Sequence, residues 1–249
     1  MLEVHGLSKS FGALAVTQAV NLRLAAGARH ALIGPNGAGK TTLVNLLTGT
    51  LAPSAGRIVL DGQDLVGLPP HVRARRGLSR TYQINSLFLD LTPLQSVALA
   101  IAQRDGYALR FWGYAQRGRR GTEEAAALLE SVGLADCLHQ PTRMLPYGRQ
   151  RLLEVALALA GRPKLLLLDE PAAGVSAEGS ERLFEVLERL PADLAILLIE
   201  HDMRFVFRFA TRITVLVGGA VLTDGTPREI AADERVREVY LGRRHAHAA

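Results

Sequence analysis

Short apolar runs alternate with helical patterns along most of the chain. The runs at 165–168 and 194–199 are uninterrupted and that at 28–33 is mostly apolar; all three are of strand length, which predicts strands buried in a sheet. The segments 43–48 and 176–190 instead repeat apolar residues at helical spacing. Buried strands that alternate with helices indicate an α/β domain.

Further strands are predicted near both ends of the chain, where turn residues separate short apolar segments. These segments are 2–7 and 16–24 around a turn at 9–13, 57–60 before Asp61-Gly62, and 212–217 and 220–223 around Gly218-Gly219. We expect them to form antiparallel strands, those at the N-terminal end in a subdomain beside the main sheet. After the last of them, Thr226-Pro227-Arg228-Glu229 has the residues of a capping box and predicts a short helix.

A helical block without a convincing strand begins after Gln83. Thr92 has the residues of a capping box and predicts a helix to about Gln103. Thr122 is predicted to cap a second helix that ends at Gly133. The stretch 104–120 between them is rich in glycine and arginine, and we expect a solvated loop or a segment near a membrane face.

The helical block is predicted to be an insert within one domain of 249 residues. Its expected extent is about 84–159, and the α/β core with its antiparallel subdomain would then comprise 1–83 and 160–249.

The clearest motif lies between the first buried strand and the helix that follows it. Gly34-Pro35-Asn36-Gly37-Ala38-Gly39-Lys40-Thr41-Thr42 matches the phosphate-binding loop, G-x-x-x-x-G-K-[ST]. Glycines let successive backbone N–H groups point at an anion, and the new helix adds its positive end. We expect Lys40 to reach the outer phosphates of a nucleotide and the Thr41 hydroxyl to hold Mg²⁺.

Two later strands are predicted to end in groups suited to nucleotide hydrolysis. Asp169 and Glu170 follow the run at 165–168, and His201 follows the run at 194–199. Ligands bind at the carboxyl ends of strands in open α/β sheets. We therefore expect Asp169 to orient Mg²⁺, Glu170 to polarise the attacking water, and His201 to contact the γ-phosphate or that water.

Composition excludes some classes of protein and leaves others open. The single cysteine, Cys137, excludes an internal disulfide and most cysteine-based metal sites. We identify no signal peptide and no apolar run near the roughly 20 residues that span a bilayer. The net charge of +5 suits a nucleotide, a nucleic acid or an anionic membrane surface, or reflects an arginine-rich solvated surface.

The order and spacing of the motifs resemble the nucleotide-binding subunit of an ABC transporter over almost the whole chain. Gly34–Thr42 resembles Walker A, 165–170 resembles Walker B, and 145–150 resembles the signature motif. Gln83 resembles the Q-loop glutamine, and His201 the switch histidine.

This resemblance implies a P-loop NTPase (RecA-like) fold that binds ATP with Mg²⁺, and it assigns roles to individual residues. The implied catalytic residues are Lys40, Glu170 and His201. The implied magnesium residues are Thr41, Gln83 and Asp169. Phe11 would stack on adenine. The other implied nucleotide contacts within one subunit are Val16, Asn36, Gly37, Ala38, Gly39, Lys40, Thr41, Thr42 and Gln83. Across a dimer, the implied contacts are Tyr147, Gly148 and Arg149.

Several segments are similar to the branched-chain amino acid importers, and among their two ATPase types to the LivG type. They are 11–16, Arg80-Thr81-Tyr82-Gln83, 145–154, 171–174, 200–203 and Val239-Tyr240-Leu241-Gly242. The resemblance implies a peripheral subunit at the cytoplasmic face of a bacterial inner membrane. Its implied partners are a second ATPase subunit, identical or different and arranged head to tail, two permease subunits and, indirectly, a periplasmic binding protein. No nucleic acid is implied.

Two segments depart from the family pattern. Pro146 and Tyr147 stand where the signature usually has Ser-Gly. Pro146 has neither a hydroxyl nor an N–H, so two possible phosphate donors are absent, while the Tyr147 and Gly148 N–H groups remain. We hypothesise that the Arg149 guanidinium compensates in part. Ser176 stands where an aspartate is frequent, and we expect it to cap a helix instead.

Three other functions remain possible from the sequence. The first is a lipopolysaccharide-export ATPase, which the LivG type resembles closely. The second is an ABC ATPase of DNA repair or translation, although the chain has neither a long coiled coil nor a second nucleotide domain. The third is a nucleotide-binding regulatory module without turnover, which the presence of Lys40, Asp169, Glu170 and His201 disfavours. The transported solute is not determined by these residues.

Overall fold

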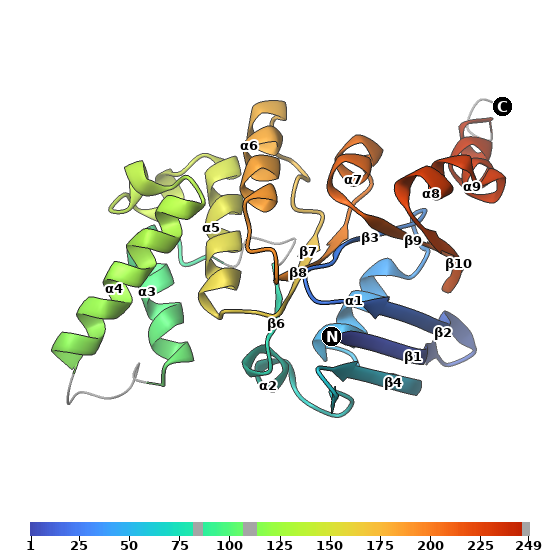
Figure 1. The fold of residues 1–249 in the computed structure, drawn as a ribbon, viewed down its shortest axis with the longest axis horizontal. Coiled ribbons are helices and arrows are strands. Elements are labelled where there is room, and N and C mark those ends of the chain that lie inside the picture. Colours follow the sequence, from blue (N-terminus) through green and yellow to red (C-terminus); the bar gives the residue numbers. More distant parts are fainter. Residues whose placement is uncertain (82–86, 107–113, 246–249) are drawn as a thin grey trace. The chain divides into compact units, whose positions relative to one another are not determined.

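The computed structural model describes residues 1–81, 87–106 and 114–245, of which 114–118 and 241–245 are described by their backbone alone. They form two compact units, 1–76 together with 192–249, and 77–191. Figure 1 shows the elements of both units. The predicted division into a core and an insert at about 84–159 stays a prediction.

The first unit contains parallel strands, those at 29–33 and 195–199 predicted from apolar runs and that at 212–217 from a hairpin pattern. β3 (Arg29–Ile33) pairs in parallel with β8 (Ala195–Ile199) and with β9 (Arg212–Val217). β10 (Ala220–Gly225) turns back antiparallel to β9, which confirms the predicted hairpin. All five residues of β8 are buried, because both faces of the sheet are covered.

A second, antiparallel sheet lies in the same unit. Its strands are β1 (Leu2–Phe11), β2 (Leu14–Leu24), β4 (Ala55–Leu60) and β5 (Gln63–Asp64), in the order β2-β1-β4-β5. Figure 1 shows β1, β2 and β4 side by side. The turn predicted at 9–13 is present but shorter, at residues 12–13, because β1 continues until Phe11, which pairs with Leu14.

The first unit also contains helices. They are α1 (Lys40–Thr48), α2 (Pro70–Arg75), α7 (Met203–Phe209), α8 (Pro227–Ala232) and α9 (Glu234–His245). The predicted capping boxes at Thr226 here and at Thr92 in the second unit are both present. α9 was not predicted, because its sequence lacks a clear apolar stripe.

The second unit combines a strand pair with helices. β6 (Leu78–Arg80) and β7 (Leu165–Asp169) run in parallel, with Leu78 opposite Leu165 and Arg80 opposite Leu167. The helices are α3 (Pro93–Arg104), α4 (Tyr114–Ser131), α5 (Tyr147–Ala160) and α6 (Ala177–Glu188), with 3-10 turns at Ala135–Cys137 and Thr142–Met144.

The predicted start of a helix at Thr122 was wrong. α4 begins at Tyr114, so Thr122 lies inside the helix and residues 114–120 of the basic stretch are helical. Ala125, Leu129 and Val132 are buried, and α4 packs against α3 and α5. Such packing outweighs the local preference of threonine and acidic residues for a first turn.

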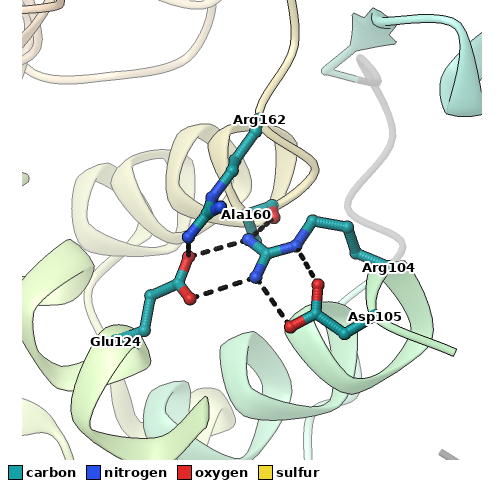
Figure 2. Close-up of polar contacts among 5 residues, drawn as sticks. All are labelled: Arg104, Asp105, Glu124, Ala160 and Arg162. Atoms are coloured by element: carbon teal, nitrogen blue, oxygen red, sulfur yellow. Dashed lines mark hydrogen bonds and ion pairs between the residues drawn. The ribbon is translucent and has the colours of Figure 1, made fainter. Parts of the chain in front are cut away.

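A cluster of charges joins three helices of this unit (Figure 2). Arg104 Nη1 and Nη2 donate to the two carboxylate oxygens of Glu124 at 2.7 and 3.0 Å, and Nη1 also donates to the Ala160 carbonyl at 2.8 Å. Arg162 Nη2 donates to Glu124 at 3.0 Å. The hydrogen bonds to Glu124 and Asp105 raise the pKa of Arg104. The cluster therefore fixes the C-terminal ends of α3 and α5 to α4.

Among the described residues, no helix is long and apolar enough to span a membrane.

The end of α1 is held by a buried arginine. Arg73 Nη1 donates to the carbonyl oxygens of Leu46 and Leu47, both at 2.7 Å, and its Nε donates to Leu68 at 2.9 Å. Arg73 is 2% exposed. These bonds satisfy carbonyls that a helix leaves without partners at its C-terminal end. Arg73 thus anchors the C-terminal end of α1, the helix that begins at Lys40 of the phosphate loop.

We expect Arg73→Met to lower the free energy of unfolding by at least roughly 2 kcal/mol, because a buried acceptor left unsatisfied costs about 1–3 kcal/mol. Urea denaturation measures the change. The control is Arg75→Met on the exposed face of the same helix, which should change it by less than about 0.5 kcal/mol. Equal effects of the two substitutions would contradict the anchoring role.

Candidate functional site

The phosphate loop lies between β3 and α1, as predicted. Gly39 adopts φ +96° and precedes the first residue of α1, Lys40. Lys40 Nζ donates to the carbonyl oxygens of Gly34 and Pro35 at 2.7 and 3.1 Å, so the lysine side chain folds back along the loop. Thr41 is exposed in the first turn of α1, and Asn36 and Gly37 are exposed in the loop. The loop therefore presents the start of a helix, a lysine and a hydroxyl together.

Backbone groups from two other segments support this loop. The Gly219 N–H donates to the Ala38 carbonyl at 3.0 Å, and the Gln18 N–H donates to the Gly219 carbonyl at 2.7 Å. A Cβ at Gly39 would lie 2.7 Å from the Val16 carbonyl oxygen, and one at Gly219 would lie 2.4 Å from the same atom. Both positions therefore require glycine, and Val16 reaches the loop through its backbone.

Gly219 was predicted only as a hairpin turn residue. Its contact with the phosphate loop joins positions far apart in the sequence, so no local sequence pattern predicts it.

His201 and the phosphate loop lie at the same edge of the parallel sheet in the first unit. Leu32 of β3 is opposite Ile199 of β8, so both strands end at this edge. The His201 side chain is 67% exposed. The Glu200 side chain is 1% exposed, and it accepts a hydrogen bond from the His201 N–H at 2.9 Å. Glu200, which was not predicted as a site residue, thus fixes the backbone that carries His201.

Phe11 is available for stacking. It is the last residue of β1, it is 50% exposed, and Lys9 Nζ lies 5.2 Å from the centroid of its ring. Its predicted role toward adenine stays a prediction.

Tyr240 of α9 is a further contact of the phosphate loop. The Gly34 N–H donates a hydrogen bond to its phenol oxygen. Burial raises the pKa of Tyr240 to about 12, although the hydrogen bond from Gly34 acts in the opposite direction. The phenol is therefore neutral at physiological pH. In the sequence, residues 239–242 were identified only as a segment similar to the family, and Tyr240 was not predicted to contact the phosphate loop.

In the second unit, the predicted carboxylates stand at the end of β7. The Asp169 side chain is 1% exposed, and its Oδ2 accepts a hydrogen bond from Arg80 Nη2 at 2.7 Å. Glu170 adopts φ +47°, a left-handed conformation that is uncommon for residues other than glycine. Such strained residues are frequent at functional sites. Arg80 was not predicted as a site residue.

The predicted signature residues begin α5. Tyr147 and Gly148 are its first two residues, after Pro146 at the N-cap. The Tyr147 ring packs against Gly174, where a Cβ would lie 3.4 Å from Cε1, and the Arg151 guanidinium lies 5.1 Å from the ring centroid.

Arg149 has a partner within the unit. Its Nη1 lies 2.8 Å from Oδ2 of Asp136, and this hydrogen bond raises the pKa of Arg149. Arg149 is therefore already paired with Asp136 in its own unit, and its predicted role toward a nucleotide stays a prediction. Ser176 accepts a hydrogen bond from the Gly179 N–H at 3.2 Å, which confirms its expected role as a helix cap.

The remaining predicted residue, Gln83, lies outside the described residues. Thr42 lies in the first turn of α1 beside Thr41. Thr41 belongs to the first unit and Asp169 to the second.

A glycine-rich loop that joins a buried parallel strand to a helix and ends in Lys-Thr defines a P-loop nucleotide-binding domain. A family model described as "ABC transporter" matches residues 17–173. The chain belongs to this family. A second model, described as "Branched-chain amino acid ATP-binding cassette transporter", matches residues 220–246.

The chain is similar to known proteins over nearly its full length. It is 39% identical to the high-affinity branched-chain amino acid transport ATP-binding protein BraF of Pseudomonas aeruginosa, over 97% of this chain and 98% of that protein. It is also 39% identical to LivG of Escherichia coli K12, with the same coverage. A solved ATP-binding cassette of an ABC transporter in its ADP conformation superposes with a TM-score of 0.84 at 27% identity, over 97% of this chain and 98% of that one.

We expect Gly219→Ala to weaken ATP binding by roughly tenfold or more, because small displacements of a binding group have large effects. The added Cβ would push against the Val16 carbonyl and shift the loop. The control is Gly218→Ala, which has a positive φ of +55° but no atom within 4 Å of its Cβ. Isothermal titration calorimetry with ATP measures both. Equal affinities in the two variants would contradict the supporting role of Gly219.

Proposed function

We propose that the chain is the ATP-binding and ATP-hydrolysing subunit of an ABC importer for branched-chain amino acids or related small solutes. The observation that carries the proposal is the 39% identity to BraF and LivG across 97% of this chain. The match of residues 220–246 to a model of branched-chain amino acid transporters supports it from a separate part of the chain.

In this proposal the phosphate loop binds the phosphates of ATP. The N–H groups of Gly37 to Thr42 and the Lys40 ammonium are the donors, and Lys40 exchanges its bonds to the loop carbonyls for bonds to phosphate. Phe11 stacks on adenine, with Val16 beside it. The exposed Phe11 ring and the backbone contact of Val16 with Gly39 support these two assignments.

The predicted magnesium residues carry a carboxylate, a hydroxyl and an amide, which are oxygen donors that suit a magnesium ion bound together with a nucleotide. Among the described residues, no group of three or more His, Cys, Asp or Glu side chains could hold a metal alone. Mg²⁺ usually keeps several waters and takes one or two carboxylates in addition to phosphate oxygens. We assign Asp169, the Thr41 hydroxyl and Gln83 to it. When bound, the ion neutralises charge on the phosphates.

Hydrolysis requires a base for the attacking water, and we assign Glu170. Its position directly after a buried strand, with φ +47°, supports a fixed carboxylate in that role. His201, exposed at the edge of the parallel sheet, contacts the γ-phosphate or the water. Tyr147, Gly148 and Arg149 of a second ATPase subunit complete each nucleotide site, in a head-to-tail dimer of like or unlike subunits.

The dimer acts with two permease subunits at the cytoplasmic face of a bacterial inner membrane, and a periplasmic binding protein delivers the solute. The similarity to BraF and LivG favours this import function over lipopolysaccharide export and over a role in DNA repair or translation. Nucleic acid has no part in the proposal.

We expect Glu170→Gln to leave ATP binding within about twofold of the wild type and to reduce turnover by roughly 10²–10⁴-fold, the usual contribution of a general base. ATP-bound dimers should accumulate in size-exclusion chromatography. The control is Glu178→Gln in the same unit. The Glu178 side chain is 78% exposed, so this variant should retain full turnover. Wild-type turnover in Glu170→Gln would contradict the assignment.

The solute is tested by reconstitution. The chain, copurified with its permease and binding-protein partners in proteoliposomes, should drive ATP-dependent uptake of labelled leucine, and unlabelled isoleucine and valine should compete. Uptake of none of these by an assembly that hydrolyses ATP would overturn the solute assignment.

A further inference from the structure

The Asp169 carboxylate is held by a neighbour that the sequence motifs do not assign. Arg80 Nη2 lies 2.7 Å from Asp169 Oδ2, and the two side chains are 9% and 1% exposed. Both residues lie in the second unit. Their distance is that of a charge-assisted hydrogen bond, the stronger class of hydrogen bond in proteins.

The pairing of β6 with β7 explains how Arg80 reaches this carboxylate. Arg80 is opposite Leu167, and the Thr81 N–H donates to the Leu167 carbonyl at 3.0 Å. The ladder therefore fixes Arg80 two positions before Asp169 on the neighbouring strand. A long side chain is needed to cover that step, and arginine supplies it with a rigid planar head.

A buried ionised carboxylate needs compensation by charge or hydrogen bonds. Arginine is charged at every physiological pH and can hold one carboxylate oxygen in a fixed direction. Partners that orient a metal ligand in this way tune the metal affinity of the site.

We propose that Arg80 is a positioning residue for magnesium, which acts by fixing the Asp169 carboxylate through Oδ2. This inference rests on the proposed function, because Asp169 is the carboxylate assigned to Mg²⁺. Arg80 acts through Asp169 and touches neither nucleotide nor metal.

The test is a comparison of nucleotide affinity with and without magnesium in the full-length protein. Calorimetry with a non-hydrolysable ATP analogue gives one dissociation constant in Mg²⁺ and one in EDTA. Arg80→Met should leave the EDTA value unchanged and reduce the gain in affinity from Mg²⁺ by roughly 10–100-fold, the usual effect of losing a partner that orients a metal ligand. Arg80→Lys should restore part of the gain.

Two further variants separate positioning from a structural effect. Arg104→Met removes another arginine of the second unit, 16% exposed and paired with Glu124 and Asp105. It should lower stability but keep the magnesium gain. In an Asp169→Asn background, adding Arg80→Met should change the magnesium gain no further, because its effect passes through Asp169.

The outcomes distinguish the inference from the function on which it rests. If the wild type gains no affinity from Mg²⁺, the proposed function fails. If the wild type gains affinity and Arg80→Met gains as much, only the inference fails. If Arg80→Met does not fold, the comparison is made between Asp169→Asn and the double variant. The double variant removes both charges, so neither is left unpaired. A smaller magnesium gain in the double variant than in Asp169→Asn overturns the inference.

Discussion

The phosphate loop is held by backbone groups, and the rest of the first unit is arranged to supply them. Gly39 and Gly219 both face the Val16 carbonyl oxygen, at distances that leave no room for a Cβ. The β9–β10 hairpin and β2 therefore have to meet at the loop, which ties the antiparallel sheet to the parallel one. Arg73 fixes the far end of α1, so the helix that begins at Lys40 is held at both ends.

In the second unit, buried ion pairs hold side chains in position, whereas in the first unit backbone contacts hold the phosphate loop. Arg80 with Asp169 and Arg151 with Glu154 are both close ion pairs, and none of the four side chains is more than 9% exposed. Burial raises the pKa of Glu154 even though Arg151 opposes the shift. Breaking such a pair leaves one buried charge behind, so each pair specifies a position more than it adds stability. In the pair with Asp169, the position specified is that of the assigned magnesium carboxylate.

Local signals predicted much of the fold. The runs at 165–168 and 194–199 correctly predicted β7 and β8. Successive residues of a strand point to opposite faces of the sheet, so a continuous apolar run indicates a strand buried on both faces. The capping boxes at Thr92 and Thr226 were correct, since the cap and its partner lie three residues apart. The start at Thr122 was wrong, because packing of α4 extends the helix through a sequence that resembles a first turn.

The parts of the site that the sequence did not predict depend on contacts between distant segments. The approach of Gly219 to Ala38 and of Arg80 to Asp169 follows from strand order and register, and that of Tyr240 to Gly34 from the placement of α9. Nothing in the residues next to Gly219 distinguishes it from an ordinary hairpin glycine. The motif residues Lys40, Asp169, Glu170 and His201 could be chosen from the sequence, but the groups that hold them could not.

Phosphate release by the chain assembled with its membrane partners is the most direct test of ATP hydrolysis by this chain. We expect multiple turnovers of ATP that require Mg²⁺ and rise when solute-loaded binding protein is added. An assembly that binds ATP with Mg²⁺ but releases no phosphate would contradict this expectation and would indicate a regulatory nucleotide-binding module.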